Sequence, residues 1–358
     1  MTESVYVIAE GGVNHNGSLQ KAFEIVDAAS YAGADAVKFQ TFQADRLVTN
    51  TAGKAQYQER LTHAEETQFE MLRQLELSDG MHREIMARCA SCGLDFLSTP
   101  FDGESLRYLI EDLGLRQIKV PSGEITNGPL LLQAAQRADR VILSTGMATL
   151  AEIETAVAVL VRGMVDPNTH PVSLSEVLDC YAEHGTDPLK GRVSLLHCTS
   201  EYPAAMADVN LRAMDTLSQA FGLDFGLSDH TMGIAAPIAA VARGAILVEK
   251  HLTIDRNLPG PDHAASLEPA EMKDMVRSIR EIEVALGDGR KRPKGTERAN
   301  RAAIRKSIVA SRLISAGESF TSENMVFKRP GIGLSPMHYW DLKGATASRA
   351  FAIDDPIE

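Results

Sequence analysis

The sequence predicts an α/β protein built as a (β/α)₈ TIM barrel, followed by a small β-rich domain. Apolar, β-branched runs alternate with amphipathic helical stretches from residue 5 to about residue 286. There are eight such runs, which is the number of parallel strands in a barrel of this class. The chain has 358 residues, which is long enough for one barrel-sized domain and a small second domain.

The eight expected strands are short runs rich in valine, isoleucine and leucine, and a helical pattern follows nearly all of them. They are Val5–Ala9, Ala36–Gln40, Asp95–Ser98, Gln117–Val120, Arg140–Ser144, Val193–His197, Asp224–Leu227 and Ala245–Lys250. In the first helical stretch, Ser18 precedes residues 19–31 as an N-cap and Gly33 follows as a C-cap. An open doubly wound sheet is the alternative, but the first strand lacks the glycine-rich turn of a nucleotide-binding fold.

Two segments interrupt the alternation. Residues 165–191 are long for a helix–strand connection, and we expect a surface excursion there with one helix near Leu174–His184. Residues 287–303 are polar, basic and glycine-bearing, which is typical of a linker. The expected domains are therefore a barrel over residues 1–286, a linker over 287–303 and a compact, mostly β domain over 304–358.

Composition and charge narrow the classes of partner. The formal net charge of −12 disfavours nucleic acid as a binding partner. No run approaches the roughly 20 apolar residues of a membrane helix, and the N-terminus lacks the pattern of a signal peptide. Of four cysteines, Cys89 and Cys92 form one C-x-x-C pair, without the second pair of a zinc site. We therefore expect a cytoplasmic protein with reduced thiols that binds neither nucleic acid nor membranes.

Polar side chains occur at or just after the carboxyl end of every expected strand. These ends form one face of a barrel, and this is the face on which barrel enzymes carry their active sites. Such side chains are unfavourable in a hydrophobic core, because burying each of them without a hydrogen-bond partner costs a few kcal/mol. The set comprises Glu10, Lys38, Gln40, Thr99, Lys119, Ser122, Glu124, Ser144, His197, Ser200, Tyr202, Ser228, His230, Glu249 and His251.

Two groups within this set indicate specific chemistry. His230 and His251 follow adjacent strands, so their imidazoles can meet on one divalent metal ion. Lys38 and Lys119, with neighbouring hydroxyls, are suited to a phosphate pocket. Carboxylates such as Glu10 and Glu124 are available for acid–base work. A single histidine or lysine is more often structural, and that alternative stays open for each residue taken alone.

Ten ordered motifs resemble the sialic acid synthase family, whose members condense phosphoenolpyruvate with an N-acetylated mannose-type sugar. They are AEGGVNHNGS at 9–18, AVKFQTF at 36–42, KAQYQ at 54–58, LSTPFD at 97–102, KVPSGEITN at 119–127, ILSTGMAT at 142–149, LLHCTSEYP at 195–203, GLSDHT at 226–231, EKHLTID at 249–255 and GPDHAASLEP at 260–269. Residues 305–333 resemble the family's antifreeze-like (SAF) domain. The resemblance covers essentially the whole chain except residues 165–191.

The resemblance implies a role for each matching residue. Ligands of manganese or magnesium are matched by His230 and His251, and the residues expected to be catalytic are Glu10, Glu124, Lys38 and Lys119. Positions that bind phosphoenolpyruvate are matched by Lys38, Thr99, Lys119, Ser122, Ser144 and Ser228. Residues assigned to the sugar are Tyr202 and Asp262, with Gln40 and Ser200 from matching motifs. Arg305 matches an arginine that the SAF domain inserts into the other subunit's site, where it meets the acyl group of the sugar, because the family forms a domain-swapped homodimer.

The substrate is inferred from three short motifs. The sequences ITN, KAQYQ and TSEYPA look most like the legionaminic acid branch, whose substrate is 2,4-diacetamido-2,4,6-trideoxymannose and whose product is N,N'-diacetyllegionaminate. The branch that makes N-acetylneuraminate from N-acetylmannosamine shares most of these motifs. A barrel that condenses an aldose phosphate is a second alternative, although no spare basic cluster is present for a second phosphate. A non-catalytic sugar-binding protein is the third.

Overall fold

The computed structural model describes residues 4–62 and 66–358. The chain divides into two compact units, Met1–Gly287 and Asp288–Glu358. In the described part of the chain, no helix combines the length and the apolar character that crossing a membrane requires.

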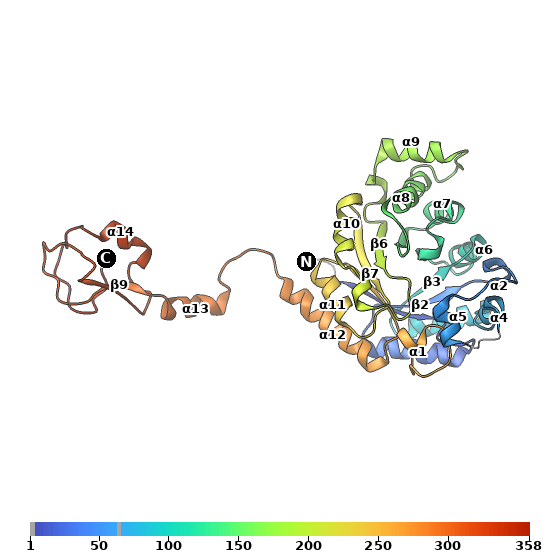
Figure 1. Ribbon diagram of the computed structural model, residues 1–358, viewed down its shortest axis with the longest axis horizontal. Coiled ribbons are helices and arrows are strands. Elements are labelled where there is room, and N and C mark those ends of the chain that lie inside the picture. The colour runs from blue at the N-terminus through green and yellow to red at the C-terminus, as the bar shows by residue number, and fades with distance from the viewer. Residues whose placement is uncertain (1–3, 63–65) are drawn as a thin grey trace. The chain divides into compact units, whose positions relative to one another are not determined.

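The first unit is a barrel of parallel strands, which confirms the predicted fold class (Figure 1). Its strands are β1 (Tyr6–Gly12), β2 (Ala36–Thr41), β3 (Asp95–Pro100), β4 (Gln117–Val120), β5 (Arg140–Ser144), β6 (Val193–Cys198), β7 (Asp224–Asp229) and β8 (Leu247–His251). Hydrogen-bonded neighbours follow the order β3-β2-β1-β8-β7-β6-β5-β4, so the ladder runs around the barrel from β3 to β4. Each of the eight predicted runs falls on one of these strands.

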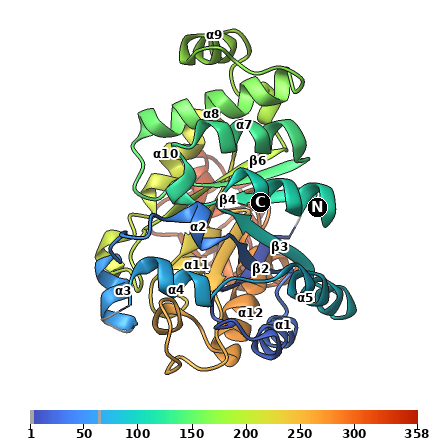
Figure 2. The same cartoon turned by 90° about the vertical axis from the view of Figure 1, so that its right-hand side faces the viewer.

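Helices follow the strands and surround the barrel (Figure 2). They are α1 (Leu19–Ala32), α5 (Asp79–Ser91), α6 (Gly103–Arg107), α7 (Gly128–Arg137), α8 (Leu150–Val165), α10 (Arg212–Phe221), α11 (Ala235–Ala242) and α12 (Pro269–Leu286). Helix α1 is capped as predicted, because the Ser18 side chain accepts a hydrogen bond from the Lys21 backbone N–H. At its other end Gly33 takes the left-handed conformation, with φ of 79°.

Two connections carry additional helices. Between β2 and β3 the chain forms α2 (Ala44–Leu47), α3 (Gln56–Leu61) and α4 (Gln68–Gln74) before it enters α5. The predicted excursion at residues 165–191 contains α9 (Leu174–His184), which packs against α8 on the outside of the barrel (Figure 2). The helix expected in that excursion is therefore present, with the predicted bounds.

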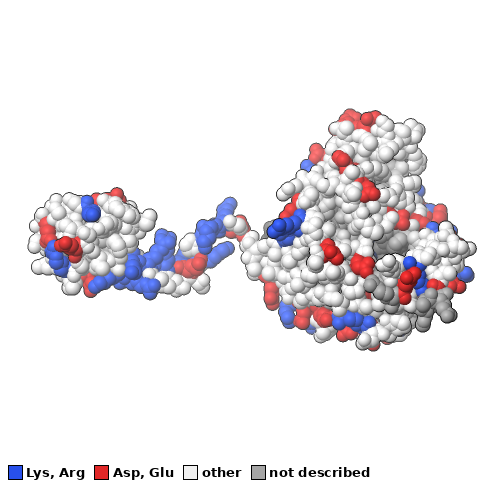
Figure 3. Space-filling model, viewed as in Figure 1, with Lys and Arg blue, Asp and Glu red and all other residues white. Residues whose placement is uncertain are grey.

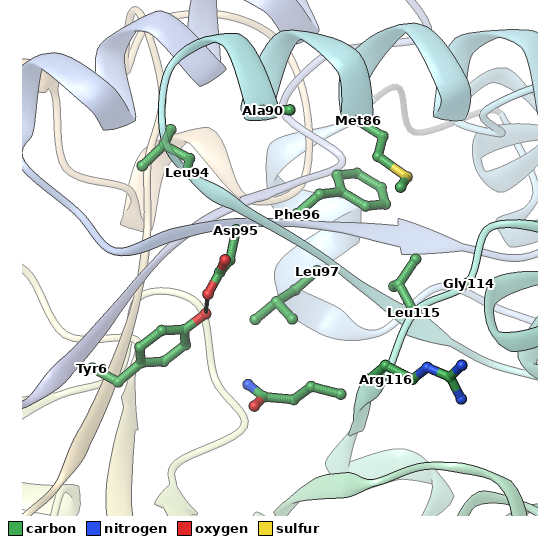
Figure 4. A pocket seen from close by; sticks show the side chains of 11 residues that line it. Tyr6, Met86, Ala90, Leu94, Asp95, Phe96, Leu97, Gly114, Leu115 and Arg116 are labelled. Carbon is green, nitrogen blue, oxygen red and sulfur yellow. Dashed lines mark hydrogen bonds between the residues drawn. The ribbon is translucent and has the colours of Figure 1, made fainter.

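Apolar side chains close the interior of the barrel below the carboxyl ends of its strands. This interior layer comprises Ile8, Ala36, Leu97, Ile142, Leu196 and Leu247. A separate cavity of about 310 Å³ opens at the opposite ends of β1, β3 and β4, between residues that include Met86, Phe96 and Leu115 (Figure 4). There the Tyr6 hydroxyl donates a hydrogen bond of 2.7 Å to Asp95 Oδ2.

The second unit contains an antiparallel pair, β9 (Ser307–Ala310) and β10 (Met325–Lys328), and the short helix α14 (Tyr339–Leu342). Its own apolar core comprises Ile308, Ala310, Ile314, Phe320, Met325, Ala347, Phe351 and Ile357. This is the compact, short-stranded domain that the sequence predicts. Helix α13 (Gly295–Ile304) lies mostly within the segment expected as a linker, and at its start Glu297 accepts a hydrogen bond from the Lys294 backbone N–H.

A buried ion pair joins β7 to β8. Asp229 and Lys250 are register partners on these strands, and Lys250 Nζ lies 2.6 Å from Asp229 Oδ2. Both side chains are almost fully buried, with exposed fractions of 1% and 0%. The backbone N–H and hydroxyl of Thr231 also donate to this carboxylate. Because side chains alternate along a strand, the pair faces away from the barrel interior while His230 and His251 face into it.

We expect Lys250→Met to lower the free energy of unfolding by roughly 3–5 kcal/mol, because the Asp229 carboxylate would stay buried without its partner. Urea unfolding of the full chain measures this change. The matched control is Arg243→Met, which breaks a partly exposed pair with Asp215 and should cost less than about 1 kcal/mol. The double variant Asp229→Asn with Lys250→Met should regain much of the loss. A Lys250→Met protein as stable as the wild type would contradict this account.

Candidate active site

One cavity of about 640 Å³ lies at the carboxyl ends of the strands and contains every barrel residue to which the sequence assigned a role. These fourteen residues are Glu10, Lys38, Gln40, Thr99, Lys119, Ser122, Glu124, Ser144, Ser200, Tyr202, Ser228, His230, His251 and Asp262. Arg305 belongs to the second unit. His197, which also occupies a strand end, does not line the cavity; its Nε2 lies 2.6 Å from the Val209 carbonyl oxygen.

Four buried charged side chains form the floor of the cavity. Lys38 Nζ lies 2.6 Å from Glu10 Oε2 and 3.7 Å from Glu249 Oε2. Lys119 Nζ lies 2.8 Å from Glu249 Oε1. The two positive charges therefore offset two negative charges, which is the condition for keeping all four in a buried site. We call these four residues the charged floor.

Glu249 is the residue of the charged floor to which the sequence analysis assigned no role. It contacts both lysines and accepts a hydrogen bond of 2.7 Å from the Ser228 hydroxyl. Its position in the sequence could have indicated this place in the cavity. Glu249 lies two residues before His251 on the same strand, and alternate residues of a strand face the same side.

The two carboxyl groups of the charged floor differ in their pKa values. Burial raises the pKa of Glu10 to about 7, although Lys38 opposes the shift. Burial acts in the same direction on Glu249, but Lys119 and Lys38 outweigh it and hold the pKa of Glu249 well below its usual range. One carboxylate is thus ionised at neutral pH while the other titrates there, a pairing often found where protons are exchanged.

Hydroxyl groups surround the two ammonium groups. Lys38 Nζ donates a hydrogen bond of 2.7 Å to Thr99 Oγ1. Ser144 Oγ is buried without a hydrogen-bond partner among the described residues. An unsatisfied buried hydroxyl in the same cavity as two lysine side chains is suited to an anion with several oxygen atoms, such as a phosphate.

Gly146 allows the loops after β4, β5 and β6 to approach one another. Its backbone N–H donates a hydrogen bond of 2.9 Å to Ser122 Oγ. A Cβ atom at this position would lie 2.4 Å from Ser200 Oγ and 2.8 Å from Cys198 Sγ, so a larger residue would displace them. Cys198 also lines the cavity, 3.0 Å from Ser122 Oγ, although the sequence predicts only a reduced thiol there.

His230 and His251 lie next to each other in the cavity, with their ring centroids 5.6 Å apart and their ring planes inclined by 58°. His230 Nδ1 lies 2.6 Å from the Thr199 carbonyl oxygen. Because a carbonyl only accepts hydrogen bonds, His230 Nδ1 carries the proton and Nε2 keeps its lone pair. His251 Nδ1 is buried without a hydrogen-bond partner in the described structure and lies 3.9 Å from Asp262 Oδ2. The Tyr202 ring packs on the His230 ring at 4.1 Å.

These two histidines fit a divalent metal ion. Burial lowers the pKa of His230 to about 4. Burial, together with the nearby His230, holds the pKa of His251 well below its usual range. Both imidazoles are therefore neutral at pH 7, which is the form that binds metals. Among the described residues, no group of three or more His, Cys, Asp or Glu side chains is arranged to hold a metal. The protein thus offers two nitrogen ligands, and solvent or substrate must supply the others.

The outer part of the cavity is polar and less buried. Gln40, Glu124, Ser200 and Tyr202 are each half-buried. Asn127 donates a hydrogen bond of 2.7 Å to Glu124 Oε2 and so fixes its orientation. A neutral, polyhydroxylated ligand would find hydrogen-bond partners here while an anion occupied the charged floor.

Three further histidines lie among buried side chains around the barrel and do not line the cavity. His263 Nδ1 lies 2.7 Å from Thr253 Oγ1, and His82 Nε2 lies 2.8 Å from Thr41 Oγ1. His15 is fully buried. Burial lowers the pKa of His15 and of His263 to about 4, and it lowers the pKa of His82.

We expect His15, His82 and His263 to lower the free energy of unfolding as the pH drops from about 6.5 to 4. Each folded-state pKa lies below the unfolded value of 6.5, so the unfolded chain binds more protons in this window. Above this window both states are neutral at these residues and the effect is absent. Urea midpoints between pH 7.5 and 4.5, measured with a chelator present, would record it.

His263→Gln should reduce the slope of the unfolding free energy against pH, by an amount that corresponds to at most one bound proton. His338→Gln, at an exposed position in the second unit, serves as the control and should leave it unchanged. Identical slopes for wild type and His263→Gln would contradict the explanation.

Known proteins resemble the chain over nearly its whole length. The NeuB family model matches residues 25–291 and the SAF domain model matches residues 305–358, which confirms the resemblance drawn from the motifs. The N,N'-diacetyllegionaminic acid synthase of Campylobacter jejuni is 44% identical over 351 residues, or 98% of each chain. The protein of the same name from Legionella pneumophila is 44% identical over 96% of this chain and 90% of its own. Among solved structures, N-acetylneuraminic acid (sialic acid) synthetase from Leptospira borgpetersenii, in complex with citrate, aligns with a TM-score of 0.65 and 32% identity over 83% of this chain and 90% of its own.

Proposed function

Because the chain belongs to the NeuB family, we propose that it condenses phosphoenolpyruvate with 2,4-diacetamido-2,4,6-trideoxymannose, giving N,N'-diacetyllegionaminate and phosphate. The observation that carries this proposal is that the charged floor and two neighbouring, neutral histidines share one cavity. The names of two relatives at 44% identity support the choice of sugar. N-acetylmannosamine, which would give N-acetylneuraminate, is the alternative substrate.

Phosphoenolpyruvate binds over the charged floor in this proposal. Lys38 and Lys119 attract its phosphate and carboxylate, and the hydroxyls of Thr99, Ser122 and Ser144 donate hydrogen bonds to them. The Ser228 hydroxyl lines the same site and donates its proton to Glu249. Both lysine side chains already lie close to carboxylates, so they are oriented before the substrate arrives. Ser144 Oγ gains the partner that it lacks in the structure.

The sugar binds in the outer part of the cavity, with its aldehyde near His230 and His251. These two residues hold a divalent ion, Mn²⁺ or Mg²⁺, which when bound polarises the aldehyde oxygen as a Lewis acid. Gln40, Ser200, Tyr202 and Asp262 contact the hydroxyl and acetamido groups of the sugar. The residues thereby hold the aldehyde carbon next to C3 of phosphoenolpyruvate.

The reaction forms a carbon–carbon bond between C3 of phosphoenolpyruvate and C1 of the sugar, and a carbon–oxygen bond between water and C2. The bond between C2 and the bridging oxygen breaks, so phosphate leaves with that oxygen and C2 becomes a ketone. The aldehyde oxygen becomes a hydroxyl group with a proton that the water supplies. Glu10, which lies 2.6 Å from Lys38, orients the water and accepts its proton. Glu124, fixed by Asn127, supplies a second carboxylate near the sugar. The expected location is the cytoplasm, which the four free cysteines support.

We further propose a homodimer in which the second unit of one subunit completes the cavity of the other. Arg305 follows helix α13, and basic side chains gather along residues 290–306 (Figure 3). The second unit also exposes large apolar side chains that an interface would cover. They are Phe327, Ile332, Met337 and Trp340, and both Phe327 and Trp340 pack on Tyr339.

Phosphate release from phosphoenolpyruvate tests the function directly. With Mn²⁺, we expect faster release with 2,4-diacetamido-2,4,6-trideoxymannose than with N-acetylmannosamine, and none with either after chelation. His230→Ala and His251→Ala should each lower kcat/KM at least ~100-fold, because each removes one of two nitrogen ligands. His338→Ala is the control and should behave like the wild type. Absence of release with every acylated mannose derivative would refute the proposal.

Arg305→Ala tests the partner's contribution. We expect the KM for the sugar to rise at least ~10-fold while the KM for phosphoenolpyruvate changes less than ~2-fold, because the arginine contacts only the sugar. Arg298→Ala, on the same helix, is the matched control. When Arg305→Ala is mixed and reassembled with inactive Lys38→Met, half of the dimers contain one subunit of each variant. One of the two sites in such a dimer has both Lys38 and Arg305, so about one quarter of wild-type activity should return. Unchanged sugar kinetics, or no restoration on mixing, would contradict the exchange.

A further inference from the structure

One side of the active-site cavity is apolar. Leu47 and Val48 from the end of α2, and Met71, Leu72 and Leu75 from α4 and its C-cap, line it. Met71, Leu72 and Leu75 are buried, and the other two are half-buried. We call these five residues the apolar wall. They pack with Val13, Phe42, Ala44 and Phe101 into one hydrophobic cluster, in which the rings of Phe42 and Phe101 meet at 5.8 Å.

The apolar wall comes from a different part of the chain than the charged floor. All charged residues that line the cavity come from β1, β2, β4, β8 or the loops that follow strands. The cavity-lining residues that the structure describes between positions 44 and 75 are instead apolar or carry carboxamides, as Gln56, Gln58 and Gln68 do. The cavity therefore has an ionic side and an uncharged side, and a ligand that spans it must match both.

The proposed reaction fixes which end of the sugar meets the charged floor. The aldehyde carbon must lie beside His230, His251 and C3 of phosphoenolpyruvate, so the C4–C6 end of the sugar extends away from the floor. This reasoning rests on the proposed function. We propose that the apolar wall receives the C6 methyl group and so selects a 6-deoxy sugar over its 6-hydroxy counterpart.

The chemistry of the two substituents explains the selection. A methyl group at C6 leaves water and contacts the side chains of Met71 and Leu72, which is favourable. A hydroxyl group at the same place loses its hydrogen bonds to water and finds no donor, and only the weak acceptor of the Met71 thioether, on these side chains. Pockets that discriminate one such small group typically give factors of roughly 10–200 in kcat/KM. The neighbouring glutamine carboxamides offer both donors and acceptors to an acetamido group at C4.

The test compares sugars that differ at C6 alone. We expect wild type to use 6-deoxy-N-acetylmannosamine with a kcat/KM at least ~10-fold above that of N-acetylmannosamine. Met71→Gln keeps the length of the side chain and adds a polar end, so it should reduce this preference ~10-fold, chiefly through the KM for the sugar. The KM for phosphoenolpyruvate should stay unchanged.

Met86→Gln is the matched control, because Met86 lies on α5 and lines the separate cavity at the other end of the barrel (Figure 4). It should keep the wild-type preference. Leu47→Gln, at a half-buried position of the wall, is expected to act in the same direction as Met71→Gln and replaces it if that variant fails to fold. Melting temperatures of all variants identify such failure.

Two outcomes would overturn the proposal on its own. The first is a wild-type enzyme that condenses both sugars with equal kcat/KM, and the second is a folded wall variant that keeps the full preference. If the wild type releases no phosphate with either of these sugars or with 2,4-diacetamido-2,4,6-trideoxymannose, both the proposed function and the proposal for the apolar wall are refuted.

Discussion

Charge balance within the charged floor is the constraint on which the rest of the site depends. Glu10 and Lys38 are register partners on β1 and β2, and Glu249 from β8 contacts both Lys38 and Lys119. Four charges at this depth are tolerable only while each faces an opposite charge. The strand register that pairs Glu10 with Lys38 also pairs Glu10 with His251. A shift of β1 by one residue would therefore separate Glu10 from Lys38 and from His251 at the same time.

Support for the floor comes from outside the barrel interior. Asp229 and Lys250 alternate with the inward-facing Ser228, His230, Glu249 and His251 along β7 and β8, and their ion pair joins the two strands behind the site. The side chains that face the cavity are thus positioned by side chains that never reach it. This arrangement places the reactive groups on rigid strands, where small displacements are costly.

In the proposed reaction, chemistry and selectivity come from different parts of the fold. The strand ends carry the charged floor and the two histidines, whereas the connection from β2 to β3 carries the apolar wall. Connections in barrels can vary without disturbing the strands, because they run over the surface of the core. A family of enzymes that share one condensation can in this way adapt to sugars that differ far from the aldehyde.

The sequence by itself determined the barrel, the position of each strand and the set of strand-end residues, because hydrophobic periodicity and capping signals are local. Fourteen of those residues share one cavity, since parallel strands bring their carboxyl ends to the same face. Only the tertiary structure decided the central place of Glu249, the position of Cys198 beside Ser122, the apolar wall and helix α13, most of which lies within residues 287–303. The first three depend on which side chains meet across strands and loops far apart in the chain, and the spacing of residues along a single sequence does not carry that information.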